Sequence, residues 1–225
     1  MRASLQLSRL ALARMTARDF YEALWERVPE GLEPSDFELR RRFLLDGLSA
    51  GRRVLDVGCG EGAFTSELAR AGARVVGVDV AEEPLRRARS RDPSLDLRLV
   101  EPAGPWELPD SSFDVVWAGE VIEHVADTAS WMSELRRVLC SGGLLLISTP
   151  AHELTERLRL AFSERAFAQH FDPRSDHLRF YSRRTLSALI CEFGFESVSV
   201  VPARAGAGWG SASRVLLARA VRSRF

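Results

Sequence analysis

The sequence predicts a three-layer α/β sandwich around a mostly parallel, seven-stranded sheet. Short apolar runs with the length of buried strands recur along the chain, and segments with helical spacing separate the first five of them. A loop rich in glycine and alanine joins the last two runs, which permits an antiparallel terminal strand. Alternating strands and helices favour parallel strands with right-handed crossovers. A chain of 225 residues suits one domain of this kind.

Two amphipathic helices are expected before the first strand. Residues Asp19–Val28 and Asp36–Leu48 carry apolar side chains at helical spacing, and a short stretch containing proline and glycine separates them. We therefore expect residues 1–50 to form an N-terminal helical cap on a main domain of residues 51–225.

Strands and helices alternate through the first part of the main domain. The expected strands are Arg53–Val57, Arg74–Val78, Leu95–Val100, Phe113–Trp117 and Gly143–Ser148. The expected helices are Ala63–Ala71, Glu83–Arg91 and Thr128–Leu139.

An insertion interrupts this alternation after the fifth strand. Ala151–Arg174 is polar and helical in period, and we expect residues 151–182 to form a lid that shields a site from water and holds an apolar or aromatic molecule. The ring-bearing side chains of this lid are His152, Phe162, Phe167, His170, Phe171, His177, Phe180 and Tyr181. The alternative is that these rings only pack into the core. A helix over Arg183–Phe193 and strands over Glu196–Val201 and Ser213–Val221 complete the expected fold.

Composition limits the classes of partner. The 31 basic and 31 acidic side chains balance, so no net charge attracts nucleic acid, and such binding is not favoured. Three widely separated cysteines suit a reducing, cytoplasmic compartment better than a disulfide framework. No apolar run reaches the ~18 residues that cross a bilayer. The basic segment Met1–Arg18 is either a weak membrane-surface helix or a frayed end. The oligomeric state is left open.

A glycine loop and an acid form the strongest motif. In the segment VLDVGCGEG, Gly58, Gly60 and Gly62 stand where a strand passes into a helix, so the backbone can approach a ligand closely. Asp56 lies two residues ahead of this loop. The second strand ends about twenty residues onward at Asp79, where a carboxylate can accept both hydroxyls of a ribose. The alternative is that the glycines only tighten a turn and Asp79 caps the next helix.

From Arg52 to Pro150 the chain resembles the class I S-adenosylmethionine (AdoMet)-dependent methyltransferases, which have a Rossmann-like, seven-stranded fold. The resemblance implies that the glycine loop contacts the methionine end of the cofactor, that Asp79 holds the ribose and that Asp56 orients the cofactor's amino group. The residues that it assigns to the cofactor are Asp56, Gly58, Cys59, Gly60, Gly62, Asp79, Val80, Glu101 and Gly119.

Two of these assignments concern the adenine. The resemblance implies that Val80 is an apolar contact and that Glu101 is the acid after the third strand. The link EPAGPWELP is longer than the family's usual one, and Trp106 within it can cover the adenine or the acceptor. The alternative for Trp106 is a half-exposed packing role.

The segment FDVVWAGEVIEHV resembles the family's fourth strand and the loop where methyl transfer occurs. If the chain turns helical after Gly119, Glu120, Glu123 and His124 share one face. Without a metal, His124 can act as the general base. With Mg²⁺ or another divalent ion, the three side chains would be ligands. A third interpretation leaves the acids in solvent and His124 packed at the cofactor's edge.

The ExxEH spacing resembles that of ubiquinone-biosynthesis O-methyltransferases and of small-RNA 3′-terminal ribose methyltransferases. In the RNA enzymes a later histidine completes the metal site, and Asp176 and His177 loosely resemble that region. We therefore predict an AdoMet-dependent enzyme that methylates an oxygen of a small molecule: a quinone, lipid, sugar or secondary metabolite. Two alternatives are a metal-dependent RNA ribose 2′-O-methyltransferase and a non-catalytic AdoMet-binding regulatory protein.

Overall fold

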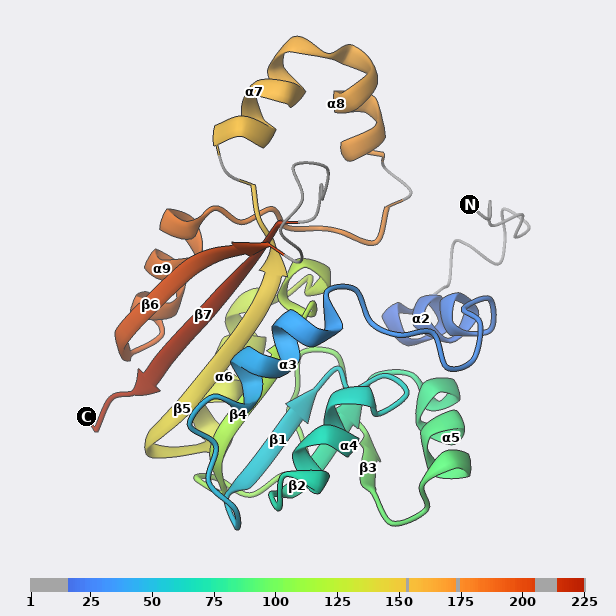
Figure 1. Ribbon diagram of the computed structural model, residues 1–225, viewed down its shortest axis with the longest axis vertical. Helices are drawn as coiled ribbons and strands as arrows, with labels where there is room; N and C mark the ends of the chain where they lie inside the picture. The colour runs from blue at the N-terminus through green and yellow to red at the C-terminus, as the bar shows by residue number, and fades with distance from the viewer. Residues whose placement is uncertain (1–15, 153, 173–174, 205–213, 225) are drawn as a thin grey trace.

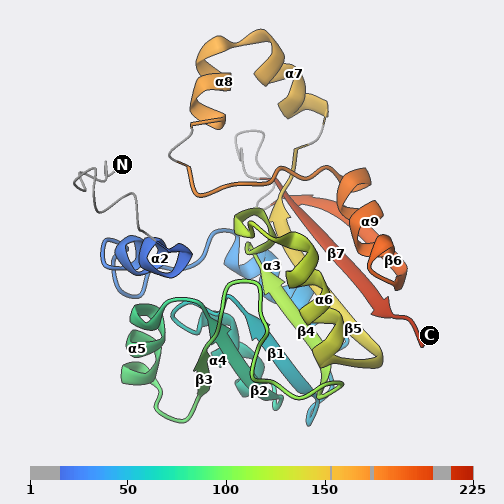
Figure 2. The same cartoon turned by 180° about the vertical axis from the view of Figure 1, so that it is seen from behind.

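The computed structural model describes residues 16–152, 154–172, 175–204 and 214–224, which form a twisted sheet with helices on both faces (Figures 1 and 2). The strands are β1 Arg53–Val57, β2 Arg74–Asp79, β3 Asp96–Leu99, β4 Phe113–Gly119, β5 Leu139–Pro150, β6 Phe195–Arg204 and β7 Arg214–Arg222. The helices are α2 Ala17–Trp25, α3 Phe37–Leu45, α4 Ala63–Arg70, α5 Glu82–Arg91, α6 Thr128–Val138, α7 Leu154–Phe162, α8 Glu164–His170 and α9 Arg183–Glu192, with a 3₁₀ turn, η1, at Ile122–His124. The three-layer sandwich predicted from the alternation is confirmed.

The sheet order explains where a ligand can bind. The order is β3-β2-β1-β4-β5-β7-β6, with neighbouring strands parallel from β3 to β5 and with β7 antiparallel to both of its neighbours. The chain builds outward from β1 in one direction and then from β4 in the other. Ligands of open α/β sheets bind at such a switch point, at the carboxyl ends of the strands. The predicted seven strands with an antiparallel C-terminal strand are confirmed.

Alternating side chains of the strands bury the two faces of the sheet. On one face, Leu55 and Val116 pack in a large cluster that includes Trp131 of α6. On the opposite face, Val54 packs in a cluster with Leu68 of α4. This alternation along β1 follows from the two-residue period of a strand. Only residues at the end of β1 can therefore reach the edge of the sheet where a ligand binds.

The fifth strand differs from the prediction. Strand β5 begins at Leu139 rather than at Gly143, because an irregularity absorbs extra residues: Phe113 pairs with Leu139, and Val115 pairs with Leu144. Gly142 adopts a φ of 74° within this irregularity. The strand therefore contains a bulge at Gly142.

The segment after β5 leaves the sheet, and helices α7 and α8 project beyond its carboxyl end (Figure 1). Its rings gather with one another: His152, His170 and Phe171 each lie about 5 Å from the ring of Phe180 between centroids. The lid role of residues 151–182 stays a prediction.

Some expectations concern residues outside the described ranges. They include most of the basic segment Met1–Arg18 and the glycine-rich loop before β7. Among the described residues, no helix is both long enough and apolar enough to span a bilayer.

Candidate active site

A cavity of about 550 Å³ lies at the carboxyl ends of β1, β2 and β4, at the switch point of the sheet. Its volume is within the range of small-molecule sites. Of the residues singled out from the sequence, those in its wall are Gly58, Asp79, Val80, Glu101, Trp106, Glu120, His124 and Asp176. The others do not line the cavity: Asp56, Cys59, Gly60, Gly62, Gly119 and Glu123.

The glycine loop closes one side of the cavity. The backbone N–H groups of Gly58 and Cys59 both donate to the carbonyl oxygen of Val78, at 2.8 and 3.0 Å, which holds the loop across the end of β2. Gly58 has a φ of 68°, and a Cβ there would lie 2.4 Å from Cγ2 of Val121. Glycine is required at this position because the loop and the residue after Glu120 approach so closely.

Asp79 ties the loop to the end of β2. Its two carboxylate oxygens accept hydrogen bonds from the backbone N–H groups of Gly60, at 2.9 Å, and Ala81, at 3.0 Å. Burial raises the pKa of Asp79, and these backbone hydrogen bonds oppose that rise. Each carboxylate oxygen can accept a further hydrogen bond, and Asp79 lines the cavity. The arrangement therefore combines the turn-stabilising role with an acceptor for ligand hydroxyls.

Asp56 lies in β1, just before the glycine loop. The structure buries it, and one carboxylate oxygen accepts a hydrogen bond of 2.6 Å from the hydroxyl of Thr65 in α4. Burial raises the pKa of Asp56 to about 7. Asp56 is therefore bonded to α4 and does not line the cavity.

Helix α2 forms an aromatic roof that the sequence motifs did not assign to the site. Phe20, Tyr21, Leu24 and Trp25 of this helix line the cavity. The helix begins at a capping box, in which Thr16 and Asp19 satisfy each other's backbone N–H groups. The apolar spacing of α2 indicates one buried face, but it does not predict which surface covers that face.

Polar contacts fasten this roof to the sheet. Arg18 donates to the carbonyl oxygens of Val80, at 3.2 Å, and Val100, at 3.3 Å, and pairs with Glu101 at 2.8 Å. The carboxylate of Glu22 accepts the backbone N–H groups of the first turn of α5. Helix α2 is thus held across the ends of β2 and β3.

The two candidate adenine residues differ in environment. The side chain of Glu101 is mostly exposed and is paired with Arg18. Trp106 is buried, and its indole N–H donates to the carbonyl oxygen of Glu101 at 2.8 Å. The half-exposed alternative for Trp106 is therefore wrong: the ring closes the cavity and packs in the main cluster on that face of the sheet.

His124 lines the cavity from η1, and Val121, just before this turn, approaches Gly58 of the glycine loop. Its Nδ1 is 3.0 Å from the carbonyl oxygen of Asp176 and 3.5 Å from a carboxylate oxygen of the same residue. A carbonyl oxygen can only accept, so the neutral ring carries its hydrogen on Nδ1 and leaves a lone pair on Nε2. The backbone carbonyl of Glu123 accepts the N–H groups of Leu178 and Arg179, which keeps Asp176 beside His124.

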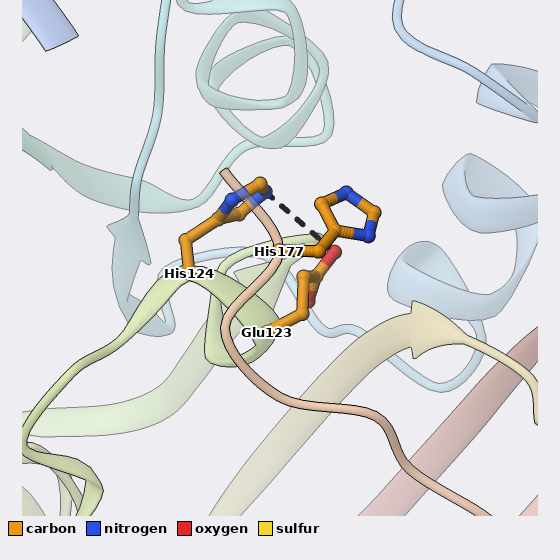
Figure 3. Close-up of side chains that lie close together, drawn as sticks. All are labelled: Glu123, His124 and His177. Atoms are coloured by element: carbon orange, nitrogen blue, oxygen red, sulfur yellow. Dashed lines mark ion pairs between the residues drawn. The ribbon is translucent and has the colours of Figure 1, made fainter. Parts of the chain in front are cut away.

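Glu123 is a buried acid with unused bonding capacity. One carboxylate oxygen accepts the hydroxyl of Thr149 at 2.8 Å, whereas Oε1 has no hydrogen-bond partner among the described residues. Burial, followed by the charge of Glu120, raises the pKa of Glu123 to about 8. Oε1 lies 3.8 Å from Nε2 of His124 (Figure 3). A buried unpaired acceptor beside a histidine nitrogen suits a proton or a cation.

The helical geometry expected after Gly119 needs correction. Glu120 has a φ of 58°, and only the short turn η1 follows it. Glu120 instead turns toward β5: its backbone N–H donates to Ser148, and its carboxylate accepts the Ser148 hydroxyl at 2.9 Å. Ser148 also accepts a hydrogen bond from the buried Arg40. Burial raises the pKa of Glu120.

The group able to hold a metal consequently has a different third member. The ligand atoms of Glu123, His124 and His177 lie within 4.8 Å of one another, and Glu120 is outside this group (Figure 3). Burial, and then the charge of His124, lowers the pKa of His177, which keeps its ring neutral. Neutral imidazoles and a carboxylate are suitable ligands for divalent transition metals.

A family model described as a methyltransferase domain matches residues 24–200, most of the chain. The chain belongs to this methyltransferase family. The match begins at the last two residues of α2 and ends within β6, so it includes strands β1 to β5 but leaves out most of α2 and all of β7. The class I membership predicted from the glycine loop and Asp79 is confirmed.

Curated relatives of this methyltransferase-family chain are similar over part of its length. A probable S-adenosylmethionine-dependent methyltransferase of Mycolicibacterium smegmatis is 41% identical over 129 residues, 56% of this chain and 50% of the relative. The human mitochondrial ubiquinone biosynthesis O-methyltransferase is 35% identical over 161 residues, 67% of this chain and 43% of the relative. The chain spans about half the length of these relatives.

Solved structures share the fold of this methyltransferase-family chain. A Haemonchus contortus phosphoethanolamine N-methyltransferase 2, bound to S-adenosylhomocysteine, has a TM-score of 0.69 at 18% identity and covers 95% of this chain and 59% of its own. A methyltransferase of Bacillus halodurans, described as putative, has a TM-score of 0.65 at 18% identity, over 84% of this chain and 100% of its own.

Proposed function

We propose that this protein transfers the methyl group of AdoMet to an oxygen atom of a small molecule. The observation that carries the proposal is one cavity whose wall contains Gly58 of the glycine loop, Asp79 and His124. Bound AdoMet supplies an activated methyl group on a sulfonium, so the protein mainly has to hold an acceptor in line with it. The predicted cytoplasmic location belongs to this proposal.

The residues around the glycine loop suit an adenosyl ligand. Asp79 presents carboxylate oxygens to the cavity for ribose hydroxyls, and the backbone at Gly58 allows close approach. Apolar side chains such as Val80 and Trp106 suit the faces of a flat base. We assign a supporting role for this surface to Asp56, Cys59, Gly60, Gly62 and Gly119. Glu101 is assigned to the rim of the surface.

The part of the cavity around His124 suits a hydroxyl as the methyl acceptor better than it suits an amine that is already unprotonated. A hydroxyl must lose its proton as its oxygen forms the new bond to carbon, and the lone pair on Nε2 of His124 can take that proton. The contact from Nδ1 to the carbonyl of Asp176 orients the ring and leaves Nε2 as the basic atom. Curated relatives include ubiquinone biosynthesis O-methyltransferases, which supports oxygen as the acceptor atom.

The proposal is tested with methyl-labelled AdoMet and a panel of acceptors: a catechol, a quinol, a sugar, a phospholipid and a primary amine. We expect label in at least one oxygen-containing acceptor, together with release of S-adenosylhomocysteine (AdoHcy). AdoHcy binding without transfer to any acceptor would favour the non-catalytic alternative. Transfer only to amines would contradict the assignment of oxygen.

A metal-assisted form of the same reaction is the second candidate, because Oε1 of Glu123 is buried without a hydrogen-bond partner. Glu123, His124 and His177 would hold the ion, which would lower the pKa of an acceptor hydroxyl. We expect Mn²⁺ to raise the melting temperature of the wild type and not that of Glu123→Gln. Asp127→Asn, at the N-cap of α6, is the control, because it changes an exposed acid outside this group. Equal shifts in all three proteins would argue against the site.

A further inference from the structure

Tyr21 faces the cavity with its hydrogen-bonding capacity unused. It lies on the inner face of α2 and lines the cavity with Asp79 and His124. Among the described residues, its hydroxyl has no hydrogen-bond partner. A buried phenol normally finds such a partner, so a hydroxyl that faces a cavity is available to a ligand.

The neighbours of Tyr21 place it between the two sides of the cavity. Its ring lies edge-on to the ring of His124, with 6.2 Å between centroids and 89° between planes. Burial raises the pKa of Tyr21, and the charges of Asp176, Asp79 and Glu123 raise it further. The phenol therefore stays protonated near neutral pH and can donate a hydrogen bond. Two of these acids, Asp79 and Asp176, line the cavity together with Tyr21.

The helix that carries Tyr21 is fixed before any ligand binds. Arg18 and Glu22, on the neighbouring turns of α2, bond to the ends of β2 and β3 and to the start of α5. Arg87 of α5 donates to the carbonyl oxygens of Trp25 and Val28, at 2.8 Å each. A hydroxyl on such an anchored helix needs little reorganisation to bind a ligand, which favours affinity.

We propose that the Tyr21 hydroxyl hydrogen-bonds the methyl acceptor and, together with Nε2 of His124, fixes the acceptor's position. This inference rests on the proposed methyltransferase function and adds a second polar anchor to the acceptor side. His124 removes the proton, whereas Tyr21 keeps its own and holds the molecule. An acceptor with two neighbouring polar groups can satisfy both residues at once.

The test uses catechol as the probe, since its adjacent hydroxyls can meet both side chains. Its affinity for the AdoHcy-loaded protein is measured by calorimetry in wild type, Tyr21→Phe and Ser90→Ala. Ser90→Ala is the control: it deletes a hydroxyl from an exposed position of α5 outside the cavity wall. We expect Tyr21→Phe to weaken catechol binding about five- to tenfold, the effect of one lost hydrogen bond. AdoHcy affinity and melting temperature should stay unchanged.

Equal catechol affinity in Tyr21→Phe and wild type would overturn the inference, as would failure of AdoHcy-loaded wild type to bind catechol. Failure of the proposed function is a separate result: either AdoHcy does not bind to the wild type, or AdoHcy binds and no acceptor of the panel takes up the label. A loss of catechol affinity in Ser90→Ala equal to that in Tyr21→Phe would also contradict a specific role for the Tyr21 hydroxyl.

Discussion

The two sides of the cavity are built in different ways. On the glycine-loop side, Asp79 and the loop residues lie within one β-α-β unit, and both oxygens of Asp79 already accept backbone N–H groups. On the histidine side, His124, Asp176 and Tyr21 come from three distant segments, and Oε1 of Glu123 and the Tyr21 hydroxyl have no partners among the described residues. The glycine-loop side, where backbone N–H groups already bond to Asp79, suits a cofactor that is the same in every turnover. The histidine side, which offers polar atoms without partners, suits the acceptor that reacts.

This contrast predicts that the histidine side can be disabled without loss of cofactor binding. His124→Asn should lower turnover about 10²–10⁴-fold, because it removes the base that accepts the hydroxyl proton. AdoHcy affinity should remain within about twofold of wild type. Steady-state rates and calorimetry on the same preparation check both parts. A parallel fall in turnover and AdoHcy affinity would show that the two sides are not separate.

A substitution on the glycine-loop side should instead lower the affinity for the cofactor. Asp79→Asn should weaken AdoHcy binding roughly a hundredfold, because a carboxamide cannot accept both ribose hydroxyls through charged oxygens. Asp96→Asn is the control, since Asp96 is an exposed acid on β3, paired with Arg98 outside the cavity. Unchanged affinity in Asp79→Asn would restrict Asp79 to stabilising the turn.

A smaller effect is expected from the fastening of the roof. Arg18→Met keeps much of the side chain's apolar bulk and deletes the hydrogen bonds to Val80, Val100 and Glu101. AdoHcy should bind several-fold more weakly, since α2 must then be ordered on binding. Arg27→Met, just beyond α2 and outside the cavity wall, should bind AdoHcy as wild type does. Equal affinities in both variants would show that α2 contributes nothing to cofactor binding.

The smallest effect concerns stability and pH. The folded protein raises the pKa of Asp56 from 3.8 to about 7, so between these values the native state holds a proton that the unfolded state has lost. The contribution of Asp56 to stability therefore falls as pH rises from about 4 to 7 and is constant above. Relative to Asp56→Asn, the wild-type melting temperature should drop by a few degrees between pH 5 and pH 8. Melting curves that shift equally in both proteins would contradict the burial argument.

The same contrast explains what the sequence could predict. The glycine loop and Asp79 are close along the chain, and strand and helix periods fix their relative positions. The fold and the glycine-loop side of the cavity could therefore be predicted from the sequence. The roles of Tyr21 and Arg18 could not be predicted, because helical spacing in α2 indicates an apolar face but not the surface that covers it. Glu120 was placed wrongly because local spacing assumed a helix, whereas bonds to Ser148 hold it in a left-handed conformation.

The most direct test is calorimetric titration of the wild-type protein with AdoHcy and, separately, with NAD⁺. The glycine loop at Gly58 and the carboxylate of Asp79 predict saturable, one-to-one binding of AdoHcy and no detectable binding of NAD⁺. Binding of NAD⁺ without binding of AdoHcy would contradict the assignment of the cavity to an adenosyl sulfonium ligand and, with it, the proposed methyl transfer.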